Sequence, residues 1–235
     1  MQISKRLETV AGMITPGCIL ADVGTDHAYI PIYLAAGGNI QRAFAMDVNK
    51  GPLAKAVEHI RQYGLEEKIE TRLSDGLEKL NPGEADSILI AGMGGPLTIR
   101  ILENGEKTAL AAKELILQPQ SEIRAVREWL EKKGFQIIQE EMVEEDGKYY
   151  PMMKVVKAEK EEYTEKMNPA ELRYGPLLLK QKHPVLKEFL IREYELNERI
   201  LSALEGKDTE TSVQRKEQVE YEQVIIRDVL CAMDK

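Results

Sequence analysis

The sequence predicts an α/β fold, a Rossmann-like sheet that ends in an antiparallel hairpin and is followed by a small α-helical domain. Over the first 160 residues, short apolar runs alternate with stretches of helical period, which is typical of βαβ units and a parallel sheet. Two extended runs then flank an acidic-glycine turn at residues 145–147, which indicates a β-hairpin. From about Lys157 the chain is charged and helical in period. We therefore expect two domains, residues 1–160 and residues 161–235.

The strands of the first domain are expected in continuous apolar runs, because strands covered by helices on both faces are buried throughout. These runs are residues 19–23, 43–48, 69–73, 87–91 and 115–117. Amphipathic stretches between the runs predict helices. They are residues 30–36, 53–63, 97–103 and 123–132, preceded by a helix over residues 1–13. The hairpin strands are expected at residues 135–143 and 149–156.

The second domain is expected to be a helical hairpin. Asn168-Pro169 predicts an N-cap followed by proline at the first helical position, and Gly175-Pro176 ends that helix. A long helix follows Pro184, and after a turn a second helix runs to the end of the chain. Apolar residues fall mostly on one face of each helix. They are Leu186, Phe189, Leu190, Tyr194, Ile200, Leu201 and Leu204, then Val219, Ile226, Val229, Leu230 and Met233. A short loop at Gly206 predicts antiparallel, coiled-coil-like packing.

The composition of the 235 residues bounds the function. With 43% hydrophobic and 31% charged residues, the chain is expected to be globular and to bury a core. No apolar run approaches the roughly 18–20 residues of a membrane span, and charges interrupt the N-terminal apolar stretch, unlike a signal peptide. Cys18 and Cys231 match no metal or redox spacing. We therefore expect a cytoplasmic protein without disulfides, bound metal or membrane contact.

The net charge of −8 argues mildly against nucleic acid as a partner, since phosphate contacts need lysine and arginine. Net charge is not charge distribution, so a nucleic-acid site would be a local patch. Basic residues gather near the long helix of the second domain, and two more near the N-terminus could extend the patch. They are Lys180, Lys182, His183, Lys187, Arg192 and Arg199, then Lys5 and Arg6. Interleaved glutamates leave an ordinary solvated face as the alternative.

The strongest candidate site follows the first strand. Asp22 ends that strand, and Gly24 lets the backbone approach a ligand at the carboxyl edge of the sheet. The dinucleotide pattern GxGxxG is not met, because Asp26 stands where the second glycine would be and would repel a pyrophosphate. A carboxylate there suits a ligand with a positive centre, hydroxyls and an amino group, such as S-adenosylmethionine. The alternative is that Asp22 and Gly24 merely cap and turn the chain.

Acidic residues also follow the next two strands. Asp47 closes the second strand about 20 residues after the glycine turn, where a carboxylate can accept hydrogen bonds from ribose hydroxyls. Asp75-Gly76 follows the third strand, where an aspartate can accept from the amino group of an adenine ring. An ordinary Asp-Gly turn is the alternative for this pair.

Glycine-rich and amide-bearing segments follow the fourth and fifth strands. Residues 91–95, Ala-Gly-Met-Gly-Gly, form a loop with little side-chain bulk, beside which a flat base could stack. A flexible turn before the next helix is the alternative. Gln118 and Gln120 follow the fifth strand, where their amides could orient a base or simply lead into a helix.

The segment from Asp22 to Pro31, Asp-Val-Gly-Thr-Asp-His-Ala-Tyr-Ile-Pro, together with residues 91–95, resembles the TrmK family of bacterial tRNA (adenine(22)-N1)-methyltransferases. The motifs occur in the right order and at the right strand ends, and the resemblance covers the whole chain. It implies a class I methyltransferase domain, S-adenosyl-L-methionine as methyl donor and tRNA as acceptor. The antiparallel hairpin agrees, because it is the expected ending of a methyltransferase-type sheet and unusual in nicotinamide-binding folds.

The resemblance also implies roles for single residues. The cofactor would be bound by Asp22, Gly24, Thr25 and Asp26 on the methionine side, Asp47 at the ribose, and Asp75 and Gly76 at the adenine ring. Ala91, Gly92, Met93 and Gly94 would lie between the cofactor and the target base. The class I pattern acidic-x-Gly-x-Gly-x-Gly is met only at its first two positions, which leaves the backbone route around the methionine moiety open.

Candidates for the chemistry follow from the substrate. Adenine N1 has a lone pair and is neutral at pH 7, so no strong base is needed and the enzyme mainly positions the reactants. The methylated ring is cationic, and a carboxylate nearby would stabilise the charge. Asp26 is the natural candidate, with His27 as proton acceptor or hydrogen-bond partner and Tyr29 at the pocket mouth. His27 could instead cap the helix, and His59 and His183 are expected on the surface.

Two other functions fit part of the pattern. The acidic net charge slightly favours a methyltransferase that acts on a protein or a small molecule. A protein that binds S-adenosylmethionine or RNA without catalysis is the second alternative, and a nicotinamide dehydrogenase is disfavoured because GxGxxG fails. The helical hairpin could pack internally or against a partner, so a monomer is favoured and a homodimer stays open.

Overall fold

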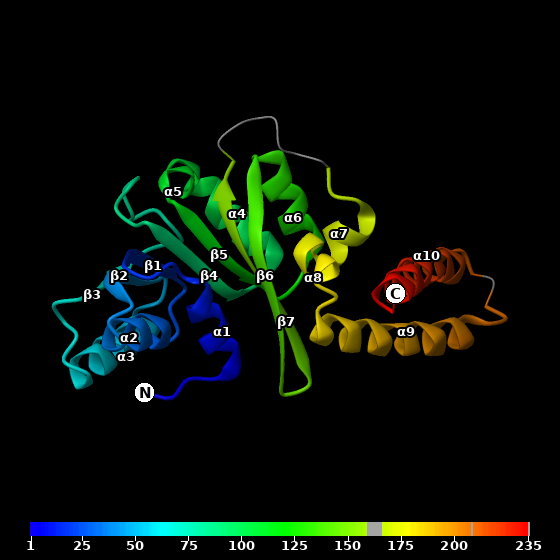
Figure 1. The fold of residues 1–235 in the computed structure, drawn as a ribbon, viewed down its shortest axis with the longest axis horizontal. Helices are drawn as coiled ribbons and strands as arrows, with labels where there is room; N and C mark the ends of the chain where they lie inside the picture. Colours follow the sequence, from blue (N-terminus) through cyan, green and yellow to red (C-terminus); the bar gives the residue numbers. More distant parts are fainter. Residues whose placement is uncertain (159–165, 208, 235) are drawn as a thin grey trace. The chain divides into compact units, whose positions relative to one another are not determined.

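The computed structural model describes residues 1–158, 166–207 and 209–234 (Figure 1). The chain divides into two compact units, Met1–Lys166 and Met167–Lys235. The boundary expected between residues 160 and 161 lies outside the described residues.

The first unit is a sheet flanked by helices. Its strands are β1 (Cys18–Val23), β2 (Ile40–Asp47), β3 (Ile69–Leu73), β4 (Ser87–Met93), β5 (Glu114–Pro119), β6 (Phe135–Glu145) and β7 (Lys148–Lys157). Its helices are α1 (Lys5–Met13), α2 (Tyr29–Ala36), α3 (Lys50–Gln62), α4 (Gly95–Asn104), α5 (Glu106–Ala111) and α6 (Ile123–Lys132).

The strand order within the described sheet is β3-β2-β1-β4-β5-β7-β6. β1 to β5 run parallel, whereas β7 pairs antiparallel with both β5 and β6. The predicted α/β class and the terminal hairpin are thus confirmed. The chain leaves β1 toward β2 and β3, then returns on the other side of β1 as β4. That reversal is the switch point at which doubly wound folds bind ligands.

Helices cover both faces of this sheet, which explains the continuous apolar strands. One core contains Val10 of α1, Ile32 of α2 and Ile60 of α3, packed against Leu20 and Leu89 of the strands. The other core contains buried residues of α4, α5 and α6 on the opposite strand face. These include Leu102, Ala109, Val126 and Leu130, with Ala21, Ile88 and Leu115.

The predicted helices differ from the structure mainly at their ends and in two short elements. α1 begins at Lys5 rather than Met1, because Ser4 is the N-cap and its side chain accepts from the Leu7 N–H. α5 was not predicted, nor was α8 (Pro176–Lys180). Six and five residues are too few for a helical period to show in a sequence.

α1 is tied to the hairpin by polar contacts between segments far apart in the sequence. The Arg6 backbone N–H donates to Glu145 Oε1 at 3.0 Å. Lys154 Nζ donates to the Met13 carbonyl at 3.0 Å and lies 2.8 Å from Glu114 Oε2. These contacts fix the start of the chain against the last two strands of the unit.

The second unit contains α7 (Pro169–Tyr174), α8, α9 (Pro184–Leu204) and α10 (Glu210–Met233). Asn168 caps α7 in a capping box with Glu171, as predicted for the cap. α9 and α10 pack against each other, and Lys187 near the start of α9 pairs with Asp234 after the end of α10 at 2.6 Å. The helices are therefore antiparallel, while coiled-coil-like packing stays a prediction.

Burial in the helical unit follows the predicted faces only in part. The fully buried members of those faces are Leu186, Leu190, Val219, Ile226, Val229 and Met233. The other members of the predicted faces are only half-buried, namely Phe189, Tyr194, Ile200, Leu201, Leu204 and Leu230. Asn197 is buried, which apolar periodicity could not predict.

A buried ion pair joins α6 to the hairpin. Arg127 Nη2 and Nε lie 2.9 and 3.2 Å from Glu140 Oε1. The side chain of Arg127 is 1% exposed and that of Glu140 is 0% exposed. Burial lowers the pKa of Arg127 although Glu140 raises it. Removal of one partner would leave a charge buried without its counterion.

We expect Arg127→Ala to lower the free energy of unfolding by about 3–5 kcal/mol, because Glu140 would stay buried and charged. Chemical denaturation followed by circular dichroism measures this. Arg124→Ala is the matched control on the same helix, since Arg124 forms an exposed pair with Glu128. It should cost less than about 1 kcal/mol.

The double change Arg127→Met with Glu140→Leu separates charge from packing. It should recover most of the loss, because an apolar pair of similar volume leaves no buried charge. Equal losses for Arg127→Ala and Arg124→Ala would show that the buried pair does not hold α6 to the hairpin.

Candidate functional site

A cavity of about 230 Å³ lies at the carboxyl ends of β1 and β4, on the switch point of the sheet. Its lining combines two carboxylates, a guanidinium, an amide, a phenol and two glycines with a few apolar side chains. The lining residues are Arg6, Leu7, Asp22, Gly24, Asp26, Tyr29, Ile30, Ala91, Gly92 and Gln120. Six of the residues predicted from the sequence for the site lie among them: Asp22, Gly24, Asp26, Tyr29, Ala91 and Gly92.

The other predicted residues surround this lining. Thr25 is buried beneath Asp22, and His27 is half-buried beside Asp26. Met93 packs against Gly24, and Gly94 is the N-cap of α4. Asp47, Asp75 and Gly76 lie at the ends of β2 and β3, outside the cavity lining.

Asp22 is a buried carboxyl at the cavity wall. It is 6% exposed, and Thr25 Oγ1 donates to its Oδ2 at 2.6 Å. Burial raises the pKa of Asp22 from 3.8 to about 7, although the hydrogen bond from Thr25 lowers it. The charges of Asp26 and Asp47 raise this pKa further. The proton on Asp22 is therefore exchangeable near neutral pH.

Gly24 is required by both conformation and space. Its φ is +73°, and a Cβ there would lie 2.0 Å from Met93 Cε. The N–H groups of Gly24 and Thr25 both donate to the Met46 carbonyl at 2.8 Å. The turn after β1 is thereby fixed to the end of β2, and Gly24 lines the cavity with backbone atoms alone.

Three aromatic rings lie together, and one of them, Tyr29, lines the cavity. The ring centroids of His27 and Tyr29 are 5.5 Å apart at an interplanar angle of 16°, and His59 of α3 lies 5.4 and 5.6 Å from them. His59 Nδ1 is 3.3 Å from the His27 carbonyl oxygen. His27 Nε2 lies 3.6 Å from Asp26 Oδ1.

These positions exclude the alternative of a helix cap for His27 and correct the expectation for two other histidines. His27 does not cap α2, because Ala28 is the N-cap and makes no side-chain cap bond. His27 and Ala28 both have positive φ, 55° and 57°, so the tight turn itself aims the imidazole. His59 and His183 were expected on the surface, but both are half-buried. The contact of His59 crosses 32 residues, which no local motif reveals.

The glycine-rich segment expected as a loop at residues 91–95 begins inside β4, which runs to Met93, and it is held by residues of β5 and α1. Gln118 is fully buried, and its Oε1 accepts from Arg6 Nη1 at 3.0 Å and from the Gly92 N–H at 3.2 Å. Arg6 also lies over the Tyr150 ring, with Cζ 5.4 Å from the centroid. The sequence suggested Arg6 only as part of a basic patch, whereas its guanidinium forms a wall of the cavity.

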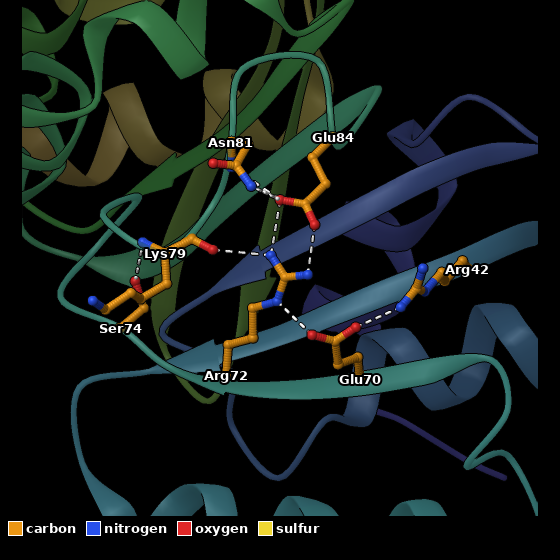
Figure 2. A network of polar contacts seen from close by, with 7 residues as sticks. All are labelled: Arg42, Glu70, Arg72, Ser74, Lys79, Asn81 and Glu84. Atoms are coloured by element: carbon orange, nitrogen blue, oxygen red, sulfur yellow. Dashed lines mark hydrogen bonds and ion pairs between the residues drawn. The ribbon is translucent and has the colours of Figure 1, made fainter.

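A polar network at the sheet edge positions the loop that carries Asp75-Gly76 (Figure 2). Arg72 of β3 donates from Nη1 to the Lys79 carbonyl and from Nη2 to Glu84 Oε1, at 2.9 and 2.6 Å. Its Nε donates to Glu70 at 2.7 Å, and Glu70 also pairs with Arg42. The hydrogen bonds from Arg72 lower the pKa of Glu84 to about 2.

Inside that loop, Ser74 is buried and sets the turn. Its Oγ donates to the Gly76 carbonyl at 2.9 Å and accepts from the Lys79 N–H at 3.1 Å. Asp75 is exposed and free of that network (Figure 2 shows the neighbouring residues). Asp47 accepts from the Asn49 N–H at 2.6 Å through Oδ1, and its Oδ2 accepts no hydrogen bond from any described residue.

The helical unit contains a larger cavity of about 470 Å³ but no comparable set of functional groups. Its walls are mostly apolar and include Leu177, Leu179 and Val229, with the exposed Lys180 and Lys182 at its edge. Lys187 is paired with Asp234. The basic residues expected as an RNA patch are thus partly neutralised by acidic neighbours.

In the part of the chain that the structure describes, no group of three His, Cys, Asp or Glu side chains could hold a metal ion. No described helix is both long and apolar enough to cross a membrane. Both cysteines are free thiols, Cys18 buried and Cys231 exposed.

Comparison with known proteins shows which family the chain resembles in sequence. A family model described as "TrmK: tRNA (adenine(22)-N(1))-methyltransferase" matches residues 20–227. The tRNA (adenine(22)-N(1))-methyltransferase of Bacillus subtilis strain 168 is 34% identical over 232 residues, which is 98% of each chain.

Solved structures with the same fold extend over both units. A Streptococcus pneumoniae protein crystallised with S-adenosyl-L-methionine is 37% identical, with a TM-score of 0.86 over 97% of this chain and 100% of that one. The M. capricolum TrmK in complex with S-adenosyl-homocysteine is 27% identical, with a TM-score of 0.84 over 99% of this chain and 100% of that one.

The raised pKa of Asp22 predicts a pH-dependent stability. Between about pH 4 and pH 7 the folded state keeps the Asp22 proton while the unfolded chain loses it, so the stability that this proton contributes falls as pH rises. Asp22→Asn removes the titration. The free energy of unfolding of the variant minus that of the unchanged protein should rise by roughly 2–4 kcal/mol from pH 4.5 to pH 7.5. Urea denaturation at several pH values measures it, and a difference that is constant with pH would contradict the assignment.

Proposed function

The chain belongs to the TrmK family of tRNA (adenine(22)-N(1))-methyltransferases, and we propose that the cavity between β1 and β4 is the place of methyl transfer. The enzyme methylates N1 of adenine 22 in tRNA and uses S-adenosyl-L-methionine as the methyl donor. The observation that supports the location is the lining itself, which joins Asp22 and Asp26 to two glycines at the switch point.

The residues at this edge fit the methyl donor. The donor carries a sulfonium cation and an ammonium group, and Asp26 and Asp47 supply negative charge at the ends of β1 and β2, while Asp22 between them can accept a hydrogen bond. Gly24 and Thr25 offer the turn around the methionine side, and the unused Oδ2 of Asp47 can accept from ribose hydroxyls. When bound, this cofactor supplies a methyl group already activated for a single displacement.

The remaining proposed cofactor contacts follow the sheet edge outward. Asp75 and Gly76 would border the adenine ring of the cofactor, in a loop held by Ser74 and Arg72. Ala91, Gly92, Met93 and Gly94 would separate the cofactor from the target base. Only two of these four residues line the cavity, so Met93 and Gly94 are supporting members of that loop.

Asp26, His27 and Tyr29 are proposed to act on the target adenine. N1 attacks as a neutral atom, and the ring becomes cationic as the new bond forms. The Asp26 carboxylate lies at the cavity wall and would stabilise that charge, while His27, 3.6 Å away, orients the carboxylate or accepts a proton. Tyr29 stacks on His27 and fixes the imidazole plane.

We also propose that the protein is a cytoplasmic monomer, with the first unit binding the cofactor and the helical unit contacting tRNA. The exposed Lys180 and Lys182 support an RNA contact by the helical unit.

The reaction and its position are tested together by methyl transfer from labelled S-adenosyl-L-methionine to unmodified tRNA, followed by nucleoside analysis. Label should appear in 1-methyladenosine when adenine occupies position 22 and should be absent when guanine replaces it. No label in either tRNA, with cofactor binding intact, would point to another substrate or to a binding protein without catalysis.

Asp26→Asn should lower kcat by about 10- to 100-fold while the Kd for S-adenosyl-L-methionine changes far less, because the carboxylate acts on charge that develops during transfer. Single-turnover methylation and calorimetry give the two quantities. Asp146→Asn is the matched control, since Asp146 is exposed at the hairpin turn. Equal losses in kcat and cofactor affinity would remove Asp26 from the chemistry.

A further inference from the structure

Methylation at N1 limits how the enzyme can recognise adenine. N1 must keep its lone pair free for attack, so no protein donor can occupy it. The opposite edge of the ring presents the N6 amino group as a donor and N7 as an acceptor. Guanine presents two acceptors, O6 and N7, at the same places. A carboxamide, which has one donor and one acceptor, therefore distinguishes the two purines without touching N1.

Gln120 is exposed and presents such a carboxamide at the wall of the cavity. Its backbone N–H donates to the Met93 carbonyl at 2.8 Å, which fixes it beside the glycine loop. Its side chain lines the cavity and makes no hydrogen bond to any residue in the described part of the chain. Both ends of this amide are therefore available to a ligand.

Gly92 keeps space for a flat base beside that amide. A Cβ at Gly92 would lie 3.9 Å from Gln120 Nε2 and 3.9 Å from Arg6 Nη1, so the glycine sits between the two polar side chains. Its φ is +78°, which a larger residue would adopt only under strain. The loop thus presents bare backbone where a base can approach.

Gln118 holds this arrangement. The two N–H donors on its Oε1, from Arg6 and Gly92, fix which end of the amide is oxygen. Its Nε2 is buried and has no hydrogen-bond partner among the described residues. A buried donor without a partner is disfavoured, and here it is kept beside the cavity by the bonds that position Arg6 and Gly92.

We propose that Gln120 reads the target adenine by accepting from N6 and donating to N7, on a wall that Gln118 positions through Arg6 and Gly92. The inference rests on the proposed function of this cavity. Arg6 is the side chain best suited to the two acceptors of guanine, and its Nη1 is already engaged by Gln118. The carboxamide of Gln120 is therefore the free group of this wall, and its donor and acceptor match adenine rather than guanine.

A double-substitution cycle between protein and base tests the contact. Unchanged enzyme and Gln120→Ala are each assayed for kcat/KM on tRNA with adenine or 7-deazaadenine at position 22, the latter lacking the N7 acceptor. The unchanged enzyme should lose about tenfold or more on 7-deazaadenine. Gln120→Ala should be slow on adenine and lose little more on 7-deazaadenine. Gln62→Ala, at an exposed glutamine of α3, is the control and should match the unchanged enzyme on both.

The outcomes separate the inference from the proposed function. The contact would be overturned if the loss in kcat/KM from Gln120→Ala and the loss from 7-deazaadenine multiplied when the two changes were combined. Full activity of Gln120→Ala on adenine would overturn it as well. Gln120→Met repeats the cycle with a side chain of similar length, so a space effect of alanine is distinguished from a lost hydrogen bond. Calorimetric binding of S-adenosyl-L-methionine shows that each variant keeps its site. If the unchanged enzyme forms no 1-methyladenosine on the adenine tRNA, the proposed function fails instead.

Discussion

The reversal of chain direction between β1 and β4 is the constraint on which the site depends. The helices after these two strands pack on opposite faces of the sheet, so no element covers the gap between the strand ends. Strand interiors here are apolar and buried on both faces, which confines polar groups to the ends. Asp22 and Gly92 therefore meet at one cavity although 70 positions separate them in the sequence.

Residues whose position follows from a strand end were predictable from the sequence. Asp22, Gly24 and Gly92 follow apolar runs, and in a parallel sheet such ends must share an edge. Arg6 and His59 were not predictable in their roles, because each reaches the site from a helix whose packing depends on distant contacts. The short helices α5 and α8 were missed because of their length, since a helix of five or six residues is too short to show a helical repeat of apolar residues.

Buried polar groups have two different functions in this unit. Arg127 and Glu140 satisfy each other and join α6 to the hairpin, so their charges stabilise only as a pair. Asp22 and Gln118 are left with incomplete partners beside the cavity. Buried polar groups with incomplete hydrogen bonding are tolerated where a ligand or a proton can supply the missing partner. Asp22 and Gln118 therefore lie beside the cavity rather than in the core.

The attachment of α1 to the hairpin has a consequence for synthesis on the ribosome. Arg6 and Glu145 are bonded across 139 positions, so the first helix emerges long before the strands that hold it. Until β6 and β7 leave the exit tunnel, α1 lacks its hydrogen bonds to Glu145 and Lys154. A nascent chain thus contains every residue that lines the cavity before it contains the strands that complete the attachment of α1.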